Sequence, residues 1–287
     1  MNFKDFYKPG RWRASFEIFP PKDEEGIANV MKALRELAPL DPAFVSCTYG
    51  ALGSTQDTTK DLVVRIRDEL KIPAAFHFTC VGLGKKAIRE YVEHLKGKGL
   101  DLVVALRGDP PQGSREFVKP KDGFSYANEL VAYLHEIDGF SIAVAGYPEG
   151  HIEAPDLETD LRNLKRKVDA GADVVITQLF FDNRFYFDFV ERARAIGIKV
   201  PIVPGIMPIL NARQIERITT ACGASLPEEL REKLRQKQDD NDQVKEIGID
   251  HAIRQCRELI SKGVPGIHFY ILNRSLSTRR VLEGLKG

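Results

Sequence analysis

The sequence lacks paired cysteines, a charge imbalance and any long apolar run, and each absence argues against a class of protein. The four cysteines are widely spaced with no C-x-x-C pair, so neither a zinc site nor a disulfide framework is indicated and a reducing compartment is expected. Lys and Arg total 42 against 41 for Asp and Glu, which argues against nucleic acid or an anionic membrane as partner. With no apolar signal core and no membrane-spanning stretch, the sequence predicts a cytoplasmic protein.

Phosphate-binding and metal-binding loops are missing as well. No G-x-G-x-x-G follows an expected strand, so a Rossmann-type dinucleotide site is not supported. The segment 82–86, GLGKK, lacks the spacing of a P-loop and is better explained as a strand-to-helix turn. The acidic residues Asp239, Asp240 and Asp242 lack the downstream Glu and Gly of a calcium loop and indicate a solvated loop. We therefore predict no metal site.

Short apolar runs recur along the chain, each followed by a stretch with helical periodicity. This alternation specifies a parallel sheet, and eight runs at intervals of about 30 residues favour a closed (β/α)8 TIM barrel over an open sheet. An extra helix is expected at 227–237, before a final barrel helix that runs through 259. The chain is thus predicted to form a single catalytic domain over residues 1–287. The expected strands are 15–19, 44–48, 75–79, 102–106, 142–147, 174–179, 201–206 and 266–272.

The ends of these runs predict where chemistry takes place. In a (β/α)8 barrel the C-terminal strand ends face one common site. Seven of the eight expected strands end in polar or ionisable residues, which favours an enzyme over a passive barrel. These residues are Glu17, Thr48, His77, Arg107 with Asp109, Tyr147, Gln178, and Asn273 with Arg274.

Each of these residues also has a purely structural explanation. Glu17, in an apolar strand, either forms a structural ion pair with Arg107 or performs acid–base work. Asp109 precedes two prolines and is explained equally well by an Asx turn. His77 is explained by a hydrogen-bonded core histidine, and Gln178 needs partners that either a ligand or the protein can supply.

A polar stripe lies on the helix expected after the fifth strand. Asp160, Asn163, Arg166 and Lys167 recur on one side of its apolar face. Such a stripe is usually a solvated surface. Beside the mouth of a barrel, it would also suit the ribose and pyrophosphate of a dinucleotide.

Several motifs together resemble the methylenetetrahydrofolate reductase family, nearly from end to end of the chain. The resemblance implies a TIM barrel, which agrees with the eight expected strands. The motifs are FEIFPP at 16–21, VSCTYGA at 45–51, HFTC at 77–80, ALRGD at 105–109, AGYPEGH at 145–151, NLKRK at 163–167, ITQLFFD at 176–182 and HFYILNR at 268–274.

The resemblance implies an enzyme that reduces methylenetetrahydrofolate to methyltetrahydrofolate, with NADH or NADPH as electron donor and FAD as carrier, in two half-reactions at one site. Glu17 would be the general acid that helps to protonate N10, and Asp109 a carboxylate facing the flavin. Gln178 would contact both folate and nicotinamide. Arg274 would bind the glutamate tail of folate, so that the implied substrate-binding residues are Glu17, Asp109, Gln178 and Arg274.

The resemblance also implies a set of FAD contacts that includes the polar stripe. The set comprises Thr48, Tyr49, Ala51, His77, Arg107, Gly108, Asp109, Tyr126, Ala127, Tyr147, His151, Asp160, Asn163, Arg166 and Lys167.

The sequence departs from the family pattern in two ways, and two alternative functions stand beside the reductase. Ala212 stands where some bacterial relatives have a phenylalanine that stacks on substrate, and the chain does not contain the C-terminal domain with which longer relatives sense S-adenosylmethionine. We therefore expect no inhibition by S-adenosylmethionine. The rivals are a flavin barrel of the proline dehydrogenase type and a non-catalytic flavoprotein subunit of an electron-transfer complex. The family resemblance implies a homo-oligomer, and the sequence leaves room for a partner subunit.

Overall fold

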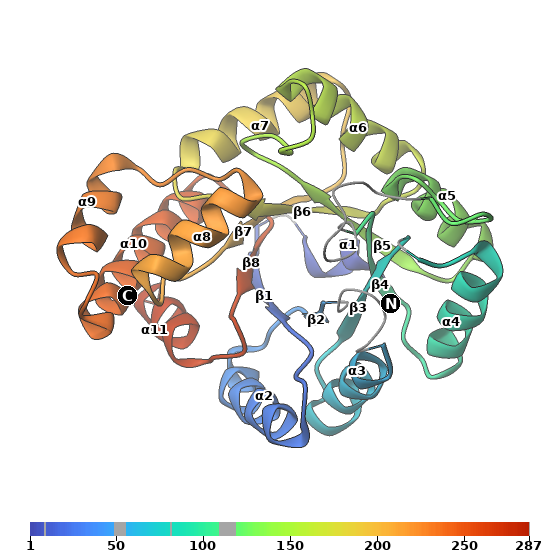
Figure 1. Ribbon diagram of the computed structural model, residues 1–287, viewed down its shortest axis with the longest axis horizontal. Helices are drawn as coiled ribbons and strands as arrows, with labels where there is room; N and C mark the ends of the chain where they lie inside the picture. Colours follow the sequence, from blue (N-terminus) through green and yellow to red (C-terminus); the bar gives the residue numbers. More distant parts are fainter. Residues whose placement is uncertain (9, 49–55, 81, 109–118, 287) are drawn as a thin grey trace.

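Eight strands pair in chain order, each parallel to the next, and β8 returns to pair with β1 (Figure 1). The computed structural model describes the chain except residues 9, 49–55, 81, 109–118 and 287, and except the side chains of residues 56–58. The closed ring of eight parallel strands confirms the predicted (β/α)8 barrel. The strands are β1 (Arg13–Ile18), β2 (Val45–Cys47), β3 (Ala74–Thr79), β4 (Leu102–Leu106), β5 (Ser141–Gly146), β6 (Val174–Leu179), β7 (Ile202–Ile206) and β8 (Gly266–Tyr270).

Helices surround the strands, as Figure 1 shows. The extra helix predicted before the last barrel helix is confirmed as α9, and the same interval also holds α8, which the sequence pattern did not predict. Within the described residues, no helix is both long and apolar enough to cross a membrane. The helices are α1 (Phe3–Phe6), α2 (Glu24–Leu37), η1 (Ala38–Leu40), α3 (Gln56–Leu70), α4 (Lys85–Gly97), α5 (Ala127–Ile137), α6 (Leu157–Asp169), α7 (Asn183–Ala195), α8 (Ala212–Cys222), α9 (Glu228–Gln236), α10 (Asn241–Ser261) and α11 (Leu276–Gly284).

Helix α6, which carries the polar stripe, has defined ends. At its start the side chain of Asp156 accepts a hydrogen bond from the backbone N–H of Thr159 at 2.6 Å, which satisfies one of the otherwise unpaired donors of the first turn. At its other end Gly171 adopts a φ of 119°, a conformation open to glycine at little cost. These two features define where α6 begins and where the chain turns after it.

Aromatic residues close the barrel at the N-terminal ends of its strands. Helix α1 places Phe3 and Phe6 against Phe44, with the Phe3 and Phe44 ring centroids 5.0 Å apart. Tyr7, just after α1, is buried in the same cluster and its hydroxyl lies 3.0 Å from Ser15 Oγ on β1. The N-terminal ends of the strands are therefore filled with apolar side chains, and ionisable groups gather toward the other end.

The ladder between β6 and β7 shifts register between Ile176 and Leu179. At this irregularity the Thr177 hydroxyl accepts a hydrogen bond from Gly205 N at 2.9 Å, and the Tyr270 hydroxyl donates to Thr177 O at 2.7 Å. Irregular pairing of this kind re-aims side chains at a strand end. Gln178 lies within this irregular stretch.

Candidate active site

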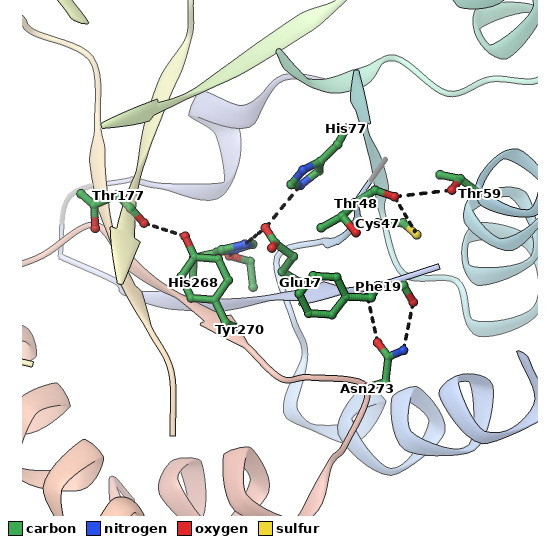
Figure 2. A network of polar contacts seen from close by, with 11 residues as sticks. Glu17, Phe19, Cys47, Thr48, Thr59, His77, Thr177, His268, Tyr270 and Asn273 are labelled. Carbon is green, nitrogen blue, oxygen red and sulfur yellow. Dashed lines mark hydrogen bonds and ion pairs between the residues drawn. The ribbon is translucent and has the colours of Figure 1, made fainter. Parts of the chain in front are cut away.

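Glu17, near the C-terminal end of β1, lies between two buried histidines (Figure 2). Its Oε2 is 3.3 Å from His77 Nε2 on β3 and 3.4 Å from His268 Nε2 on β8. The Glu17 side chain is 12% exposed, and those of His77 and His268 are 7% and 0% exposed. A carboxylate this deep in a barrel is costly unless it is paired, and the two imidazoles supply that pairing.

The structural partner suggested for Glu17 from the sequence is wrong. Arg107 instead forms a two-pronged ion pair with Glu153, in which the Nη2 to Oε1 distance is 2.8 Å. His77, suggested as either a core or a ligand-binding histidine, is buried and faces Glu17. Glu17 therefore pairs with the two histidines and not with Arg107, and the three side chains form a carboxylate–imidazole cluster.

Two opposing effects act on the pKa of Glu17. Burial raises it, but the charges and contacts of His77 and His268 together outweigh burial and lower the pKa to about 2. That lowering requires positively charged imidazoles, whereas beside neutral imidazoles burial favours the protonated carboxyl group. The Glu17 carboxyl group therefore holds a proton only when the two imidazoles beside it are uncharged.

A chain of hydrogen bonds extends from this cluster into the core. His268 Nδ1 is 2.8 Å from Ser15 Oγ, which in turn is 3.0 Å from the Tyr7 hydroxyl. Burial raises the pKa of Tyr7 well above its usual value, so the phenol keeps its proton and can donate it to Ser15. If Ser15 then donates to Nδ1, the proton of a neutral His268 lies on Nε2, facing Glu17.

Gln178 on β6 and Tyr270 on β8 lie beyond the cluster, and β7 separates their strands. Gln178 Oε1 accepts from the backbone N of Leu179 at 2.9 Å, so the protein supplies one of the partners that its amide needs. Gln178 also lines a small cavity together with Tyr147, Glu149 and Cys222. Burial is the main reason why the pKa of Tyr270 is raised well above its usual value.

The polar stripe of α6 divides into a buried and an exposed half. Lys167 Nζ donates to Ala145 O at 2.5 Å and lies 5.7 Å from the centroid of the Tyr147 ring, which meets His151 edge-on at 4.6 Å. Burial lowers the pKa of Lys167 to about 8, while the nearby charge of Asp160 opposes the change. Burial raises the pKa of Asp160. This half places an amine and a carboxyl group beside two aromatic rings.

Other predicted flavin contacts are spread around this region. Asn163 and Arg166 are exposed on α6, and Arg166 Nη1 donates to Asn163 Oδ1 at 3.2 Å. Tyr126, which is 62% exposed, and Ala127 lie at the start of α5. Tyr49, Ala51 and Asp109 lie outside the described residues. Of the remaining predicted residues, Thr48 follows β2, Arg107 and Gly108 follow β4, and Arg274 is exposed after β8.

A family profile described as "Methylenetetrahydrofolate reductase" matches residues 2–286. The chain belongs to the methylenetetrahydrofolate reductase family.

Members of this family from several kingdoms are similar to the chain. It is 38% identical to the 5,10-methylenetetrahydrofolate reductase of Escherichia coli, over 93% of this chain and 88% of that one. It is 39% identical to methylenetetrahydrofolate reductase (NADH) 1 of Arabidopsis thaliana, over 98% of this chain but only 50% of that one. The chain thus spans about half the length of this plant relative. A Clostridium thermocellum protein described as binding two copies of 5-methyl-5,6,7,8-tetrahydrofolic acid shares the fold, with a TM-score of 0.68 and 16% identity over 100% of this chain and 98% of that chain.

Sequence reasoning missed His268, Ser15 and Tyr270 as parts of the site. A signal for His268 was present, because it stands between Ile267 and Phe269 in an apolar strand, and a polar group in such a place needs a partner. The same argument singled out Glu17. Which partner each residue finds depends on how β8 aligns with β1, and the sequence pattern does not fix that alignment.

The half-buried ammonium group of Lys167 yields a stability prediction. Its lowered pKa means that the unfolded chain binds more protons than the native one between pH 8 and 10.5, so wild-type stability should rise with pH across this window. A Lys167→Met variant lacks this gain and should lose up to about 3 kcal/mol relative to wild type between these pH values. Urea unfolding at both pH values measures the difference. Lys165→Met, which removes an ion pair to Asp169 on the same helix, is the control, and equal slopes for Lys167→Met and wild type would contradict the prediction.

Proposed function

We propose that the protein reduces 5,10-methylenetetrahydrofolate to 5-methyltetrahydrofolate, with FAD as carrier and NADH or NADPH as electron donor. The observation that carries this proposal is the buried Glu17 between His77 and His268 near the C-terminal strand ends, where TIM barrels perform their chemistry. Family membership supports the reaction, and the name of the plant relative makes NADH the first donor to test.

The residues present fit a flavin dinucleotide. The exposed Arg166 and the half-buried Lys167, in the last turn of α6, supply two cationic groups for a pyrophosphate, and Asn163 adds an amide beside them. Asp160 on the same face supplies a carboxylate for a ribose hydroxyl. When bound, FAD supplies a carrier that accepts a hydride from the nicotinamide and gives it up to the folate.

Glu17 would hold the proton that the reduction consumes. Transfer of this proton to N10 breaks the bond between N10 and the bridging carbon and leaves an iminium cation that can accept a hydride. A proton from the solvent would then return to the carboxylate, and His268, with Nε2 3.4 Å from Glu17 Oε2, would stabilise it, while Ser15 and Tyr7 would hold the imidazole in place from behind. His77 would stabilise the same carboxylate from the other side. One proton and one hydride are added, which balances the reaction.

The test is a two-step titration without air. The purified protein should show a flavin spectrum, bleach on addition of NADH or NADPH, and regain its colour when methylenetetrahydrofolate is added, with methyltetrahydrofolate as product. A protein that bleaches but is never reoxidised by folate would favour the electron-transfer subunit, and one reduced by proline would favour the proline dehydrogenase type. Lack of flavin binding would overturn the proposal.

A further inference from the structure

The loop after β8 holds the end of β1 by a two-point clasp. Asn273 Oδ1 accepts from Phe19 N at 2.8 Å, and Asn273 Nδ2 donates to Phe19 O at 3.0 Å (Figure 2). One side-chain amide thus bonds both backbone polar groups of Phe19, just past the last residue of β1. The clasp continues the β1–β8 pairing beyond the point where the backbone ladder ends.

This clasp is built at a conformational cost. Leu272 and Asn273 are consecutive non-glycine residues with left-handed backbones, at φ 49° and 59°. Such conformations are rare outside glycine, and strain of this kind gathers at functional sites where the surrounding structure holds it. Here the strained loop orients the Asn273 amide toward Phe19.

Phe19, which the clasp holds, is not part of the hydrophobic core. Phe19 is 42% exposed, although Phe16 and Ile18 on the strand just before it are fully buried. Figure 2 shows its ring extending from the clasp in the direction of Glu17. Burial therefore does not explain the clasp, because a phenylalanine left in water contributes little apolar stabilisation. A rigidly held, exposed ring near a reacting carboxylate is suited to contact with a planar ligand.

The order of residues around the clasp matches the order of groups in folate. Glu17 stands two residues before Phe19, and Arg274 directly follows the clasping Asn273. In methylenetetrahydrofolate, N10 is bonded to a benzoyl ring, which is joined to a glutamate. We propose that Phe19 is a substrate-binding residue that packs against the benzoyl ring. This inference rests on the proposed function, with Glu17 at N10 on one side of Phe19 and Arg274 at the glutamate carboxylates on the other. Asn273 is then a positioning residue. Ala212, which is buried, offers no aromatic contact, and Phe19 just after β1 supplies one instead.

The test compares folate with a ligand that lacks the ring. Phe19→Ala should weaken binding of 5-methyltetrahydrofolate about tenfold, the loss expected from one aromatic contact, but should not change binding of 6-methyltetrahydropterin, which has no benzoylglutamate. In steady state, KM for methylenetetrahydrofolate should rise more than kcat falls. Phe19→Tyr should restore folate binding. Isothermal titration calorimetry gives both affinities.

The control is Ile196→Ala, which removes an apolar side chain of similar exposure, 38%, at the end of α7 remote from the C-terminal strand ends. It should bind both ligands as wild type does. Equal loss of both ligands in Phe19→Ala, or no loss of folate, would overturn the inference alone. Failure of the wild-type protein to bind 5-methyltetrahydrofolate would instead overturn the proposed function and the inference with it.

Discussion

Glu17→Gln should lower the rate of the folate half-reaction at least about 10²-fold while the protein is still reduced by NADH or NADPH. The amide has nearly the shape of the carboxyl group but no acidic proton to give, so N10 stays unprotonated and its bond to the bridging carbon stays intact. Reduction of the flavin by nicotinamide requires no proton from Glu17. The loss should therefore fall on one half-reaction only.

Rapid-mixing absorbance without air separates the two steps. The rate of bleaching with nicotinamide and the rate of recovery with methylenetetrahydrofolate are measured for Glu17→Gln and wild type. Asp173→Asn is a matched control. The Asp173 side chain is 13% exposed, close to the 12% of Glu17, and it accepts a hydrogen bond from Ser141 Oγ at 2.8 Å, but it lies at the other end of the barrel. It should leave the recovery rate unchanged. A Glu17→Gln variant that recovers at the wild-type rate would remove Glu17 from the proton transfer.

The barrel could be predicted from the sequence because each βα unit carries its own signals. Apolar runs alternate with helical periods, and the connection rules for parallel strands leave few topologies. The polar strand ends could be predicted to face one side for the same reason. The fold was thus determined by local patterns repeated eight times, and the expected strands differ from the observed ones by at most a few residues at their ends.

The partners within the site could not be predicted, because they depend on contacts distant in sequence. His268 meets Glu17 only because β8 closes on β1 in the register that pairs Ser15 with His268. Arg107 was the structural partner suggested for Glu17, yet it pairs with Glu153 in the loop after β5. A buried carboxylate predicts that some partner exists, and only the barrel geometry selects which one.

The Phe19 clasp shows a second limit of sequence reasoning. The motif HFYILNR contributed to the family resemblance, but no propensity predicts left-handed backbones at both Leu272 and Asn273. The clasp depends on tertiary context to hold that strain. Functional features that oppose local preference are the ones a sequence pattern is least able to predict.

Gly205→Ala should lower the free energy of unfolding by roughly 2–4 kcal/mol, since the interior near the site has no room for a methyl group. A Cβ at this position would lie 2.2 Å from Thr177 O and 2.7 Å from the Tyr270 ring. The added methyl group would have to separate β6 from β7 or displace the Tyr270 hydroxyl from Thr177 O. Either change would move the strand that carries Gln178.

Urea unfolding of Gly205→Ala and wild type measures this cost. Gly97→Ala is the control, because a Cβ on that last residue of α4 meets no atom within 4 Å. It should be neutral or slightly stabilising, since alanine restricts the unfolded chain more than glycine does. If Gly205→Ala were as stable as wild type, the close approach of Thr177 and Tyr270 to Gly205 would not be a fixed feature of the barrel. If it were unstable but reduced folate normally, Gln178 would not depend on this packing.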